Sequence, residues 1–172
     1  MAAMPTVLQI RQLGEPILRA SAKAVEDVGD PAIQALIDDM IATCRHVDGV
    51  GLAAPQVNRP LRLFVLASRP NPRYPHAPEM EPTAILNPAI IAAADETETG
   101  WEGCLSIPGI RGQVPRSRWV TVAYTNRLGQ REERDFAGFI ARVFQHEYDH
   151  IEGLVFLDRA RSRDLITEGS FS

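Results

Sequence analysis

Two histidines that lie four positions apart are the residues of this chain best suited to chemistry. In the segment QHEYDHIEG, residues 145–153, Glu147 directly follows His146 and precedes His150. On an α-helix this spacing places both imidazoles on one face, where they can bind one divalent metal ion. The intervening glutamate can then act as a general base toward a metal-activated water. The HExxH pattern therefore predicts a metal site with a hydrolytic function.

A helix from about Gly138 to Ile151 is expected to position these side chains. Apolar residues and the two histidines recur at helical spacing: Phe136, Phe139, Val143, His146 and His150. The histidines thus continue the apolar face instead of pointing to water. Two of them four residues apart, with Glu147 beside the first, are harder to explain as core packing than as a metal site. Gly153 suits the C-terminal end of the helix. Asp149 faces away from the metal by helical phase, and we expect it to anchor the helix with Arg116 as its partner.

A third ligand must come from elsewhere, because catalytic zinc-type sites commonly use three protein ligands and one water. Only about twenty residues follow His150, which leaves little room for the downstream glutamate of a thermolysin-like protease. A metzincin would need histidine where Phe156 stands. Cys104, in the glycine-bounded turn TGWEGCLSIPGIRG, residues 99–112, offers a thiolate. A nucleophilic Cys104 is the competing interpretation, but it leaves the helical histidines unexplained, so we prefer coordination.

The segment DGVGLAAPQV, residues 48–57, resembles a dinucleotide fingerprint through its small residues. That fingerprint requires a preceding strand, whereas this segment follows a predicted helix, so a nucleotide site is disfavoured. Gly49 and Gly51 would instead allow backbone to pass close to a substrate, with Gln56 presenting its side-chain amide. A plain tight turn is the alternative interpretation of the same residues.

Three segments taken in order, GVGLAAPQ, EGCLS and QHEYDH, resemble the three motifs of the peptide deformylases. The segments LGEPILRASAKAV and IEGLVFLDR are also similar to that family, and the likeness runs from about Val7 to Arg159. It implies removal of the formyl group from the N-terminal formylmethionine of nascent polypeptides, with release of formate. The partners implied are N-formylmethionyl nascent peptides, and contact with the ribosome near the peptide exit is a further expectation.

The resemblance also implies roles for residues of the site. One divalent ion is expected, with Fe²⁺ as the usual metal and Zn²⁺, Ni²⁺ or Co²⁺ as replacements, and its ligands would be Cys104, His146 and His150. Water on such an ion has a lowered pKa, so Glu147 would accept its proton and later hand one to the leaving amine. The Gln56 side chain and the Leu105 backbone N–H correspond to the donors that stabilise the developing oxyanion.

A methionine pocket is implied as well, lined by Val50, Gly51, Phe139 and Val143, with Arg111 near its rim. Phe139 and Val143 lie on the same helical face as the histidines, which agrees with that placement. Ordinary core packing remains the alternative for these two residues.

The rest of the chain predicts mixed elements. Asp30 as N-cap and Pro31 begin an amphipathic helix whose apolar face includes Cys44, so that thiol is expected in the core. Strands are expected at LRLFVLAS and TAILNPAII, and a hairpin with a turn at Gly129 in RWVTVAYTNRLGQREERDF. Five prolines mark residues 69–82 as a long surface loop. With the resemblance, we expect an α+β fold with antiparallel sheets packed around a central helix that carries HExxH.

Composition sets the frame for these expectations. A chain of 172 residues, 45% hydrophobic and 23% charged, fits one globular catalytic domain over residues 1–172. The net charge of −4 and the lack of a basic block give no reason to expect nucleic acid. No apolar run suits a membrane span or a secretory leader, and two cysteines make no disulfide framework, so we expect a cytoplasmic protein. An HExxH endopeptidase and a structural or sensory metal module are the alternative functions.

Overall fold

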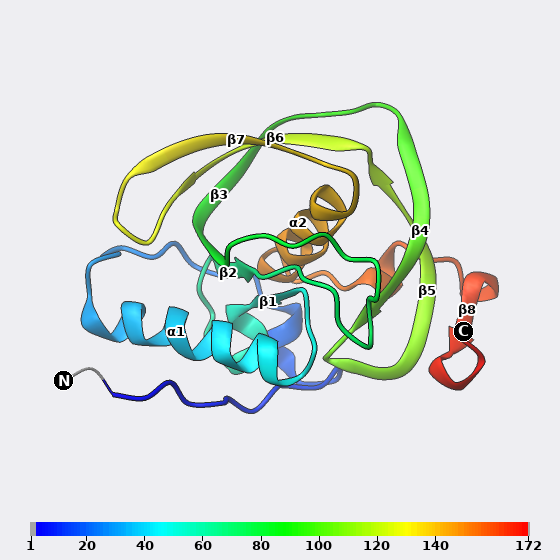
Figure 1. Cartoon of the computed structure of the whole chain (residues 1–172), viewed down its shortest axis with the longest axis horizontal. Coiled ribbons are helices and arrows are strands. Elements are labelled where there is room, and N and C mark those ends of the chain that lie inside the picture. Colours follow the sequence, from blue (N-terminus) through cyan, green and yellow to red (C-terminus); the bar gives the residue numbers. More distant parts are fainter. Residues whose placement is uncertain (1–2, 172) are drawn as a thin grey trace.

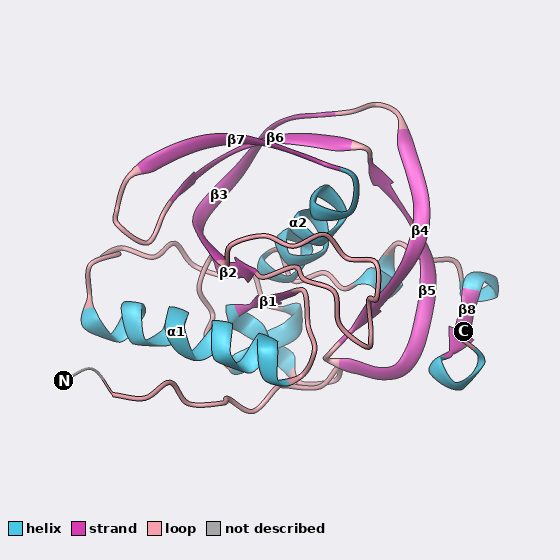
Figure 2. Cartoon of the chain, viewed as in Figure 1, coloured by secondary structure: helices cyan, strands magenta, loops and turns pink. Residues whose placement is uncertain are grey.

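The computed structural model describes residues 3–171, in which two α-helices accompany eight strands (Figures 1 and 2). The helices are α1 (Pro31–His46) and α2 (Gly138–Ile151). The strands are β1 (Gly51–Ala53), β2 (Leu63–Leu66), β3 (Thr83–Ala93), β4 (Thr97–Cys104), β5 (Ile107–Ser117), β6 (Trp119–Thr125), β7 (Arg131–Ala137) and β8 (Leu165–Thr167). Short 3₁₀ helices are η1 (Pro16–Arg19), η2 (Ala54–Val57), η3 (Phe156–Asp158), η4 (Ser162–Asp164) and η5 (Glu168–Ser170).

The strands form two antiparallel sheets. One sheet has the order β1-β2-β3-β6-β7, and the other has the order β4-β5-β8. Helix α2 lies between them, with β3, β6 and β7 curving over it and β4 and β5 beside it (Figure 1). The predicted α+β class with antiparallel sheets is therefore confirmed.

Strand β2 shows how the larger sheet separates two parts of the core. Phe64 and Leu66 pack in the cluster that contains Phe144 of α2, whereas Leu63 and Val65 pack in the cluster that contains residues of α1. Successive strand residues point to opposite faces, so this apolar run is buried on both sides. Helix α2 is consequently held against a sheet that is itself backed by α1.

Both helices begin and end where their sequences predict. Asp30 caps α1, since its carboxylate accepts a hydrogen bond from the Ala32 N–H at 2.9 Å. Cys44 of α1 is fully buried in the core, as expected. Gly153 follows the end of α2 with φ of +81°, a left-handed conformation typical of a helix C-terminus. Within residues 3–171, neither helix combines the length and apolar composition needed to cross a membrane.

The expected strands and hairpin are present, and strands also form in two glycine-containing segments where none was expected. The hairpin pairs β6 with β7 in unbroken register from Trp119 opposite Ala137 to Thr125 opposite Arg131. Residues 51–53, Gly-Leu-Ala, form β1, which pairs with β2. Cys104 ends the long strand β4, and a tight turn leads into β5. Neither strand was predicted, because glycine has no side chain to contribute to the apolar alternation typical of a strand. Backbone hydrogen bonds to the neighbouring strand still stabilise both.

Gly153 and Gly129 form a matched pair for testing how firmly the end of α2 is held. Both have positive φ, +81° and +83°. A Cβ on Gly153 would lie 2.6 Å from the carbonyl oxygen of Arg19, whereas a Cβ on Gly129 would meet nothing within 4 Å. We expect Gly129→Ala to lower the free energy of unfolding by about 1 kcal/mol through backbone strain alone. Gly153→Ala should lower it by about 3 kcal/mol or more, because backbone must also move.

Guanidinium denaturation of the two variants measures this difference. Equal losses would show that the contact between the end of α2 and the Arg19 backbone contributes nothing.

Candidate metal centre

Cys104, His146 and His150 come together at the junction of the two sheets. The thiol lies at the end of β4 and the imidazoles lie on α2, and one ligand atom from each residue falls within 4.8 Å of the others. The Sγ of Cys104 is 3.3 Å from Nε2 of His150. Both Cys104 and His150 are buried, so the three donors face one another instead of solvent.

Glu102 fixes the orientation of His146. Its carboxylate Oε1 lies 2.8 Å from Nδ1 of that ring. With Nδ1 occupied, Nε2 is the nitrogen left to face the cluster, which is the usual role of a carboxylate behind a metal-binding histidine. Burial lowers the pKa of His150 well below its ordinary value, so that ring is neutral near pH 7, as a metal ligand must be.

Glu102 is itself held by two arginines. Arg116 donates two hydrogen bonds to its carboxylate, at 2.8 and 2.9 Å, and Arg142 of α2 donates a third at 2.8 Å. Glu102 and Arg116 are each only 4% exposed. Burial alone would raise the pKa of Glu102, but the hydrogen bonds from Arg116 and His146 outweigh it and hold that pKa well below its ordinary range. The carboxylate behind His146 is therefore ionised at neutral pH.

Arg116 also connects this network to the far end of α2. It donates to Oδ2 of Asp149 at 2.6 Å, and Arg159 donates to both oxygens of the same carboxylate at 2.6 and 2.8 Å. The contact expected between Asp149 and Arg116 is thus present. The Arg116 guanidinium of β5 therefore binds two carboxylates, Glu102 of β4 and Asp149 of α2, and links both strands to the helix.

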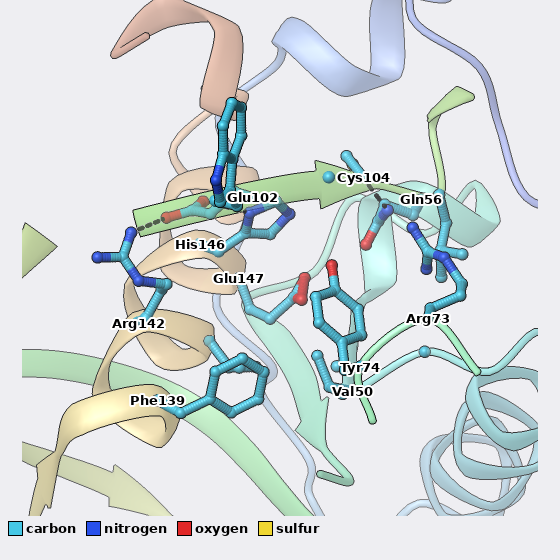
Figure 3. A pocket seen from close by; sticks show the side chains of 16 residues that line it. Val50, Gln56, Arg73, Tyr74, Glu102, Cys104, Phe139, Arg142, His146 and Glu147 are labelled. Atoms are coloured by element: carbon cyan, nitrogen blue, oxygen red, sulfur yellow. Dashed lines mark hydrogen bonds and ion pairs between the residues drawn. The ribbon is translucent and has the colours of Figure 1, made fainter. Parts of the chain in front are cut away.

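Glu147 lines the same pocket as Cys104 and His146 (Figure 3). Its side chain is buried, and its Oε1 has no hydrogen-bond partner among the described residues. Burial raises the pKa of Glu147 to about 7. A Cβ on Gly51 would lie 2.7 Å from Oε2 of Glu147, so only glycine at position 51 lets strand β1 approach the carboxylate this closely. The group can take up and release a proton near neutral pH.

These residues fit a divalent transition metal. One thiolate and two imidazoles form a donor set that suits zinc or ferrous ions. The second nitrogen of His146 is engaged by a carboxylate, and an unpartnered carboxylate oxygen of Glu147 lines the same cavity. An unpaired buried oxygen is costly in the protein alone, which is consistent with a site that is completed by a polar ligand.

Gln56 has a fixed orientation toward the cluster. Its Oε1 accepts a hydrogen bond from the Ala53 N–H at 2.9 Å, which turns its Nε2 toward Sγ of Cys104 at 3.6 Å and Oγ of Ser106 at 3.1 Å. Among the loop and turn hydrogen bonds of residues 3–171, none has the Leu105 N–H as its donor. The Gln56 amide therefore lies beside the thiol, and Leu105 lines the same pocket.

The residues expected around the methionine side chain separate into two places. Val50, Gly51, Phe139 and Val143 line the pocket that contains the cluster. Arg111 lines an adjoining groove instead. The sequence did not indicate Arg73 or Tyr74 of the proline-rich loop, yet both line the pocket, and the Tyr74 ring projects toward Glu147 (Figure 3). The five prolines of residues 69–82 predicted a surface loop and gave no indication that it lines the site.

Sequence interpretation also missed the role of Glu102, although it stands two residues before Cys104. Residues two apart in a strand point to the same face. Had residues 97–104 been recognised as a strand, Glu102 would have been expected beside the metal ligands. Arg116 would then have been a candidate partner for both acidic residues instead of Asp149 alone.

Comparison with known proteins places the chain in a family. The model of the polypeptide deformylases matches residues 7–165. The chain belongs to the peptide deformylase family. Its members are metal-dependent hydrolases that remove N-formyl groups from nascent peptides, and the buried cluster lies among the residues that the family model covers.

Individual peptide deformylases are similar over nearly the whole chain. Peptide deformylase 2 of Nostoc sp. is 54% identical over 168 residues, which cover 97% of this chain and 94% of that protein. The crystal structure of a class I type b peptide deformylase from Acinetobacter baumannii with bound Met-Ala-Ser has a TM-score of 0.86 and 44% identity, and covers 91% of this chain and 99% of that one. The peptide deformylase of Thermotoga maritima has a TM-score of 0.81 and 41% identity, covering 90% and 98%.

Replacement of Arg116 tests the charge network of the deformylase fold. Arg116→Met leaves two buried carboxylates without their shared partner, and we expect the free energy of unfolding to fall by about 3–5 kcal/mol. Arg118→Met is the matched control, because Arg118 pairs with Glu96 where the side chains are 51% and 72% exposed. That variant should lose less than about 1 kcal/mol.

Urea denaturation at pH 7 would measure both variants. If Arg116→Met is no less stable than Arg118→Met, the network does not hold α2 in place.

Proposed function

We propose that this chain removes the formyl group from the N-terminal formylmethionine of nascent polypeptides and releases formate. One divalent metal ion would be held by Cys104, His146 and His150, with Glu147 as the general base and acid. The observation that carries the proposal is the cluster of three donors within 4.8 Å, with the Glu147 carboxylate lining the same pocket.

Glu147 is suited to proton transfer on both sides of the reaction. A divalent ion held by Cys104, His146 and His150 would supply an acidified water and would polarise the formyl carbonyl. Glu147 accepts the proton of the attacking water through its free Oε1 and then delivers a proton to the amine that leaves as the amide bond breaks. Its pKa near 7 allows both transfers at neutral pH. Gly51 keeps the space beside the carboxylate open.

Gln56 and Leu105 are proposed to stabilise the oxygen of the formyl group as it gains negative charge. The Gln56 amide is oriented in advance by its hydrogen bond from Ala53, so little reorganisation accompanies the reaction. Each such donor is typically worth about 3–4 kcal/mol of barrier. Arg111 is not one of these donors, because it lines the adjoining groove.

The methionine side chain would bind in the apolar part of the pocket, between Val50, Phe139 and Val143. The Acinetobacter baumannii peptide deformylase that binds Met-Ala-Ser supports this placement, because a peptide beginning with methionine is bound by a similar fold.

Ferrous iron is the proposed resident metal, with Zn²⁺, Ni²⁺ and Co²⁺ as replacements. A thiolate with two imidazoles accepts all four, so availability in the cell and not affinity alone decides occupancy.

Both alternatives fit the site less well. A thermolysin-like endopeptidase needs a third carboxylate or imidazole ligand, whereas the metal-type cluster found among residues 3–171 uses the thiol of Cys104. A structural or sensory metal module would close the remaining coordination position with protein. Here Cys104, His146 and Glu147 line a pocket, which leaves space for a substrate.

Formate release from formyl-Met-Ala-Ser tests the proposed reaction. Wild type loaded with Fe²⁺ under anaerobic conditions should release formate. Glu147→Ala should lower kcat by about a hundredfold or more, because the water and the leaving amine lose their proton carrier. Formate is measured with a coupled dehydrogenase assay, and metal content is measured in parallel.

Two outcomes would contradict the proposal. If wild type fully loaded with Fe²⁺ releases no formate, the chain is not a deformylase. If Glu147→Ala keeps full activity, Glu147 is not the general base. Activity on unformylated peptides, with internal cleavage, would favour the endopeptidase.

The two cysteines test the ligand assignment. Both are buried, but only Cys104 belongs to the cluster. Cys104→Ser should weaken Zn²⁺ binding at least about tenfold, because it removes the soft thiolate ligand. Cys44→Ser is the matched control and should leave the affinity unchanged. Competition with a chelating dye measures both, and equal weakening would overturn the assignment.

A further inference from the structure

The pocket that contains the metal cluster continues into a second depression, which we call the outer groove and define by Arg73, Tyr74, Trp101, Arg111, Glu168 and Phe171. Arg73, Tyr74 and Trp101 line both cavities, and so does Phe139. The Tyr74 and Phe139 rings pack against each other with centroids 5.7 Å apart. A chain that leaves the metal pocket past Tyr74 therefore enters the outer groove directly.

The C-terminal segment of the chain forms the outer wall of this groove. Strand β8 pairs with β5, where Ile166 lies opposite Arg111, and Gly112 of β5 makes room for it, since a Cβ there would lie 2.7 Å from Leu165. Glu168 and Phe171 follow β8 and line the groove. Both lie beyond residue 165, where the match to the family model ends.

Aromatic side chains hold one guanidinium of the outer groove in place. The Arg111 guanidinium lies 4.9 Å from the centroid of the Tyr74 ring and 4.4 Å from that of Phe171, so it is stacked between the loop and the tail. Phe171 also meets Trp101 edge to face, at 5.7 Å between centroids. Arg111 is only 4% exposed, which marks it as a fixed positive charge in the wall of the groove.

The hydrogen-bonding capacity of the two arginines in the groove is largely unused. Glu168 Oε1 lies 3.9 Å from Nη2 of Arg73 and 3.9 Å from Nε of Arg111, beyond hydrogen-bond range. Arg111 donates only a long bond, 3.4 Å, to the Arg73 carbonyl, and the Arg73 guanidinium donates none within the described residues. Two cations thus face one loosely placed carboxylate, which leaves a net positive groove with free donors.

We propose that the third residue of the formylated polypeptide binds in the outer groove, that Arg73 and Arg111 favour an acidic side chain there, and that Glu168 limits this preference. This inference rests on the proposed deformylation. In an extended peptide, alternate side chains point the same way, so the third side chain shares the direction of the methionine that fills the inner pocket. Because an extended chain advances about 3.3 Å per residue, the third side chain lies beyond the inner pocket and reaches the outer groove.

The charges predict a measurable selectivity. A glutamate at the third position gains the donors of Arg73 and Arg111, whereas a lysine meets two like charges. The side chains of Arg73 and Glu168 are partly exposed, at 23% and 39%, so the preference is moderate and weakens with salt. We expect kcat/KM for formyl-Met-Ala-Glu-amide to exceed that for formyl-Met-Ala-Lys-amide by about three- to tenfold at low ionic strength. The C-terminal amide removes a carboxylate that would otherwise occupy the groove.

Variants assign the selectivity to the groove. Glu168→Gln should increase the Glu-to-Lys ratio, because the competing carboxylate is removed, and Arg73→Gln should bring the ratio toward one. Glu133→Gln and Arg59→Gln are controls with the same charge changes at exposed positions outside the groove, and they should leave the ratio as in wild type. Moving the charge to the second residue, as in formyl-Met-Glu-Ala-amide against formyl-Met-Lys-Ala-amide, should abolish most of the preference.

Binding separates this proposal from the proposed reaction. The unformylated peptides Met-Ala-Glu-amide and Met-Ala-Lys-amide, titrated calorimetrically into the whole protein, should show the same preference and the same changes in Glu168→Gln and Arg73→Gln. If no peptide is deformylated but this binding pattern holds, deformylation fails and the groove assignment stands. A ratio near one in wild type, or a ratio that the two variants change no more than their controls, overturns the proposal.

Discussion

A single buried carboxylate, that of Glu102, joins the sheet that carries Cys104 to the helix that carries His146 and His150. It accepts hydrogen bonds from Arg116 and Arg142 and contacts the ring of His146. A buried carboxylate without these partners would be protonated or would destabilise the fold, so the ligand geometry and the stability of α2 depend on the same charges. The metal centre is accordingly built into the core and not placed on a loop.

Helical periodicity was enough to predict α2 and the inward direction of its histidines. The spacing of apolar residues within an amphipathic helix identifies its buried face without reference to other segments. By contrast, β1 and β4 form because they pair with neighbouring strands. Gly51 and Gly103 interrupt the apolar alternation that would predict a strand, and the backbone hydrogen bonds to β2 and β5 stabilise the extended chain. Glu102 escaped notice for the same reason. A buried acid is recognised by its long-range partners, and Arg116 is fourteen residues away along the chain.

The family resemblance supplied the expected roles of Gln56 and Leu105, but it did not extend to the tail. Glu168 and Phe171 reach the outer groove only because β8 adds to the edge of β5. A strand of three residues is too short to give a clear pattern in sequence, so a wall built in this way is visible only in three dimensions. The donor cluster of the inner pocket and the charges of the outer groove are thus set by different parts of the fold.

X-ray absorption at the metal edge of the zinc-loaded protein would show directly whether Cys104, His146 and His150 bind one ion. We expect one sulfur neighbour at about 2.3 Å together with two imidazole nitrogens and one further light-atom ligand. The sulfur contribution should disappear in Cys104→Ser. A wild-type spectrum with no sulfur neighbour, or with a sulfur that persists in that variant, would contradict this ligand assignment.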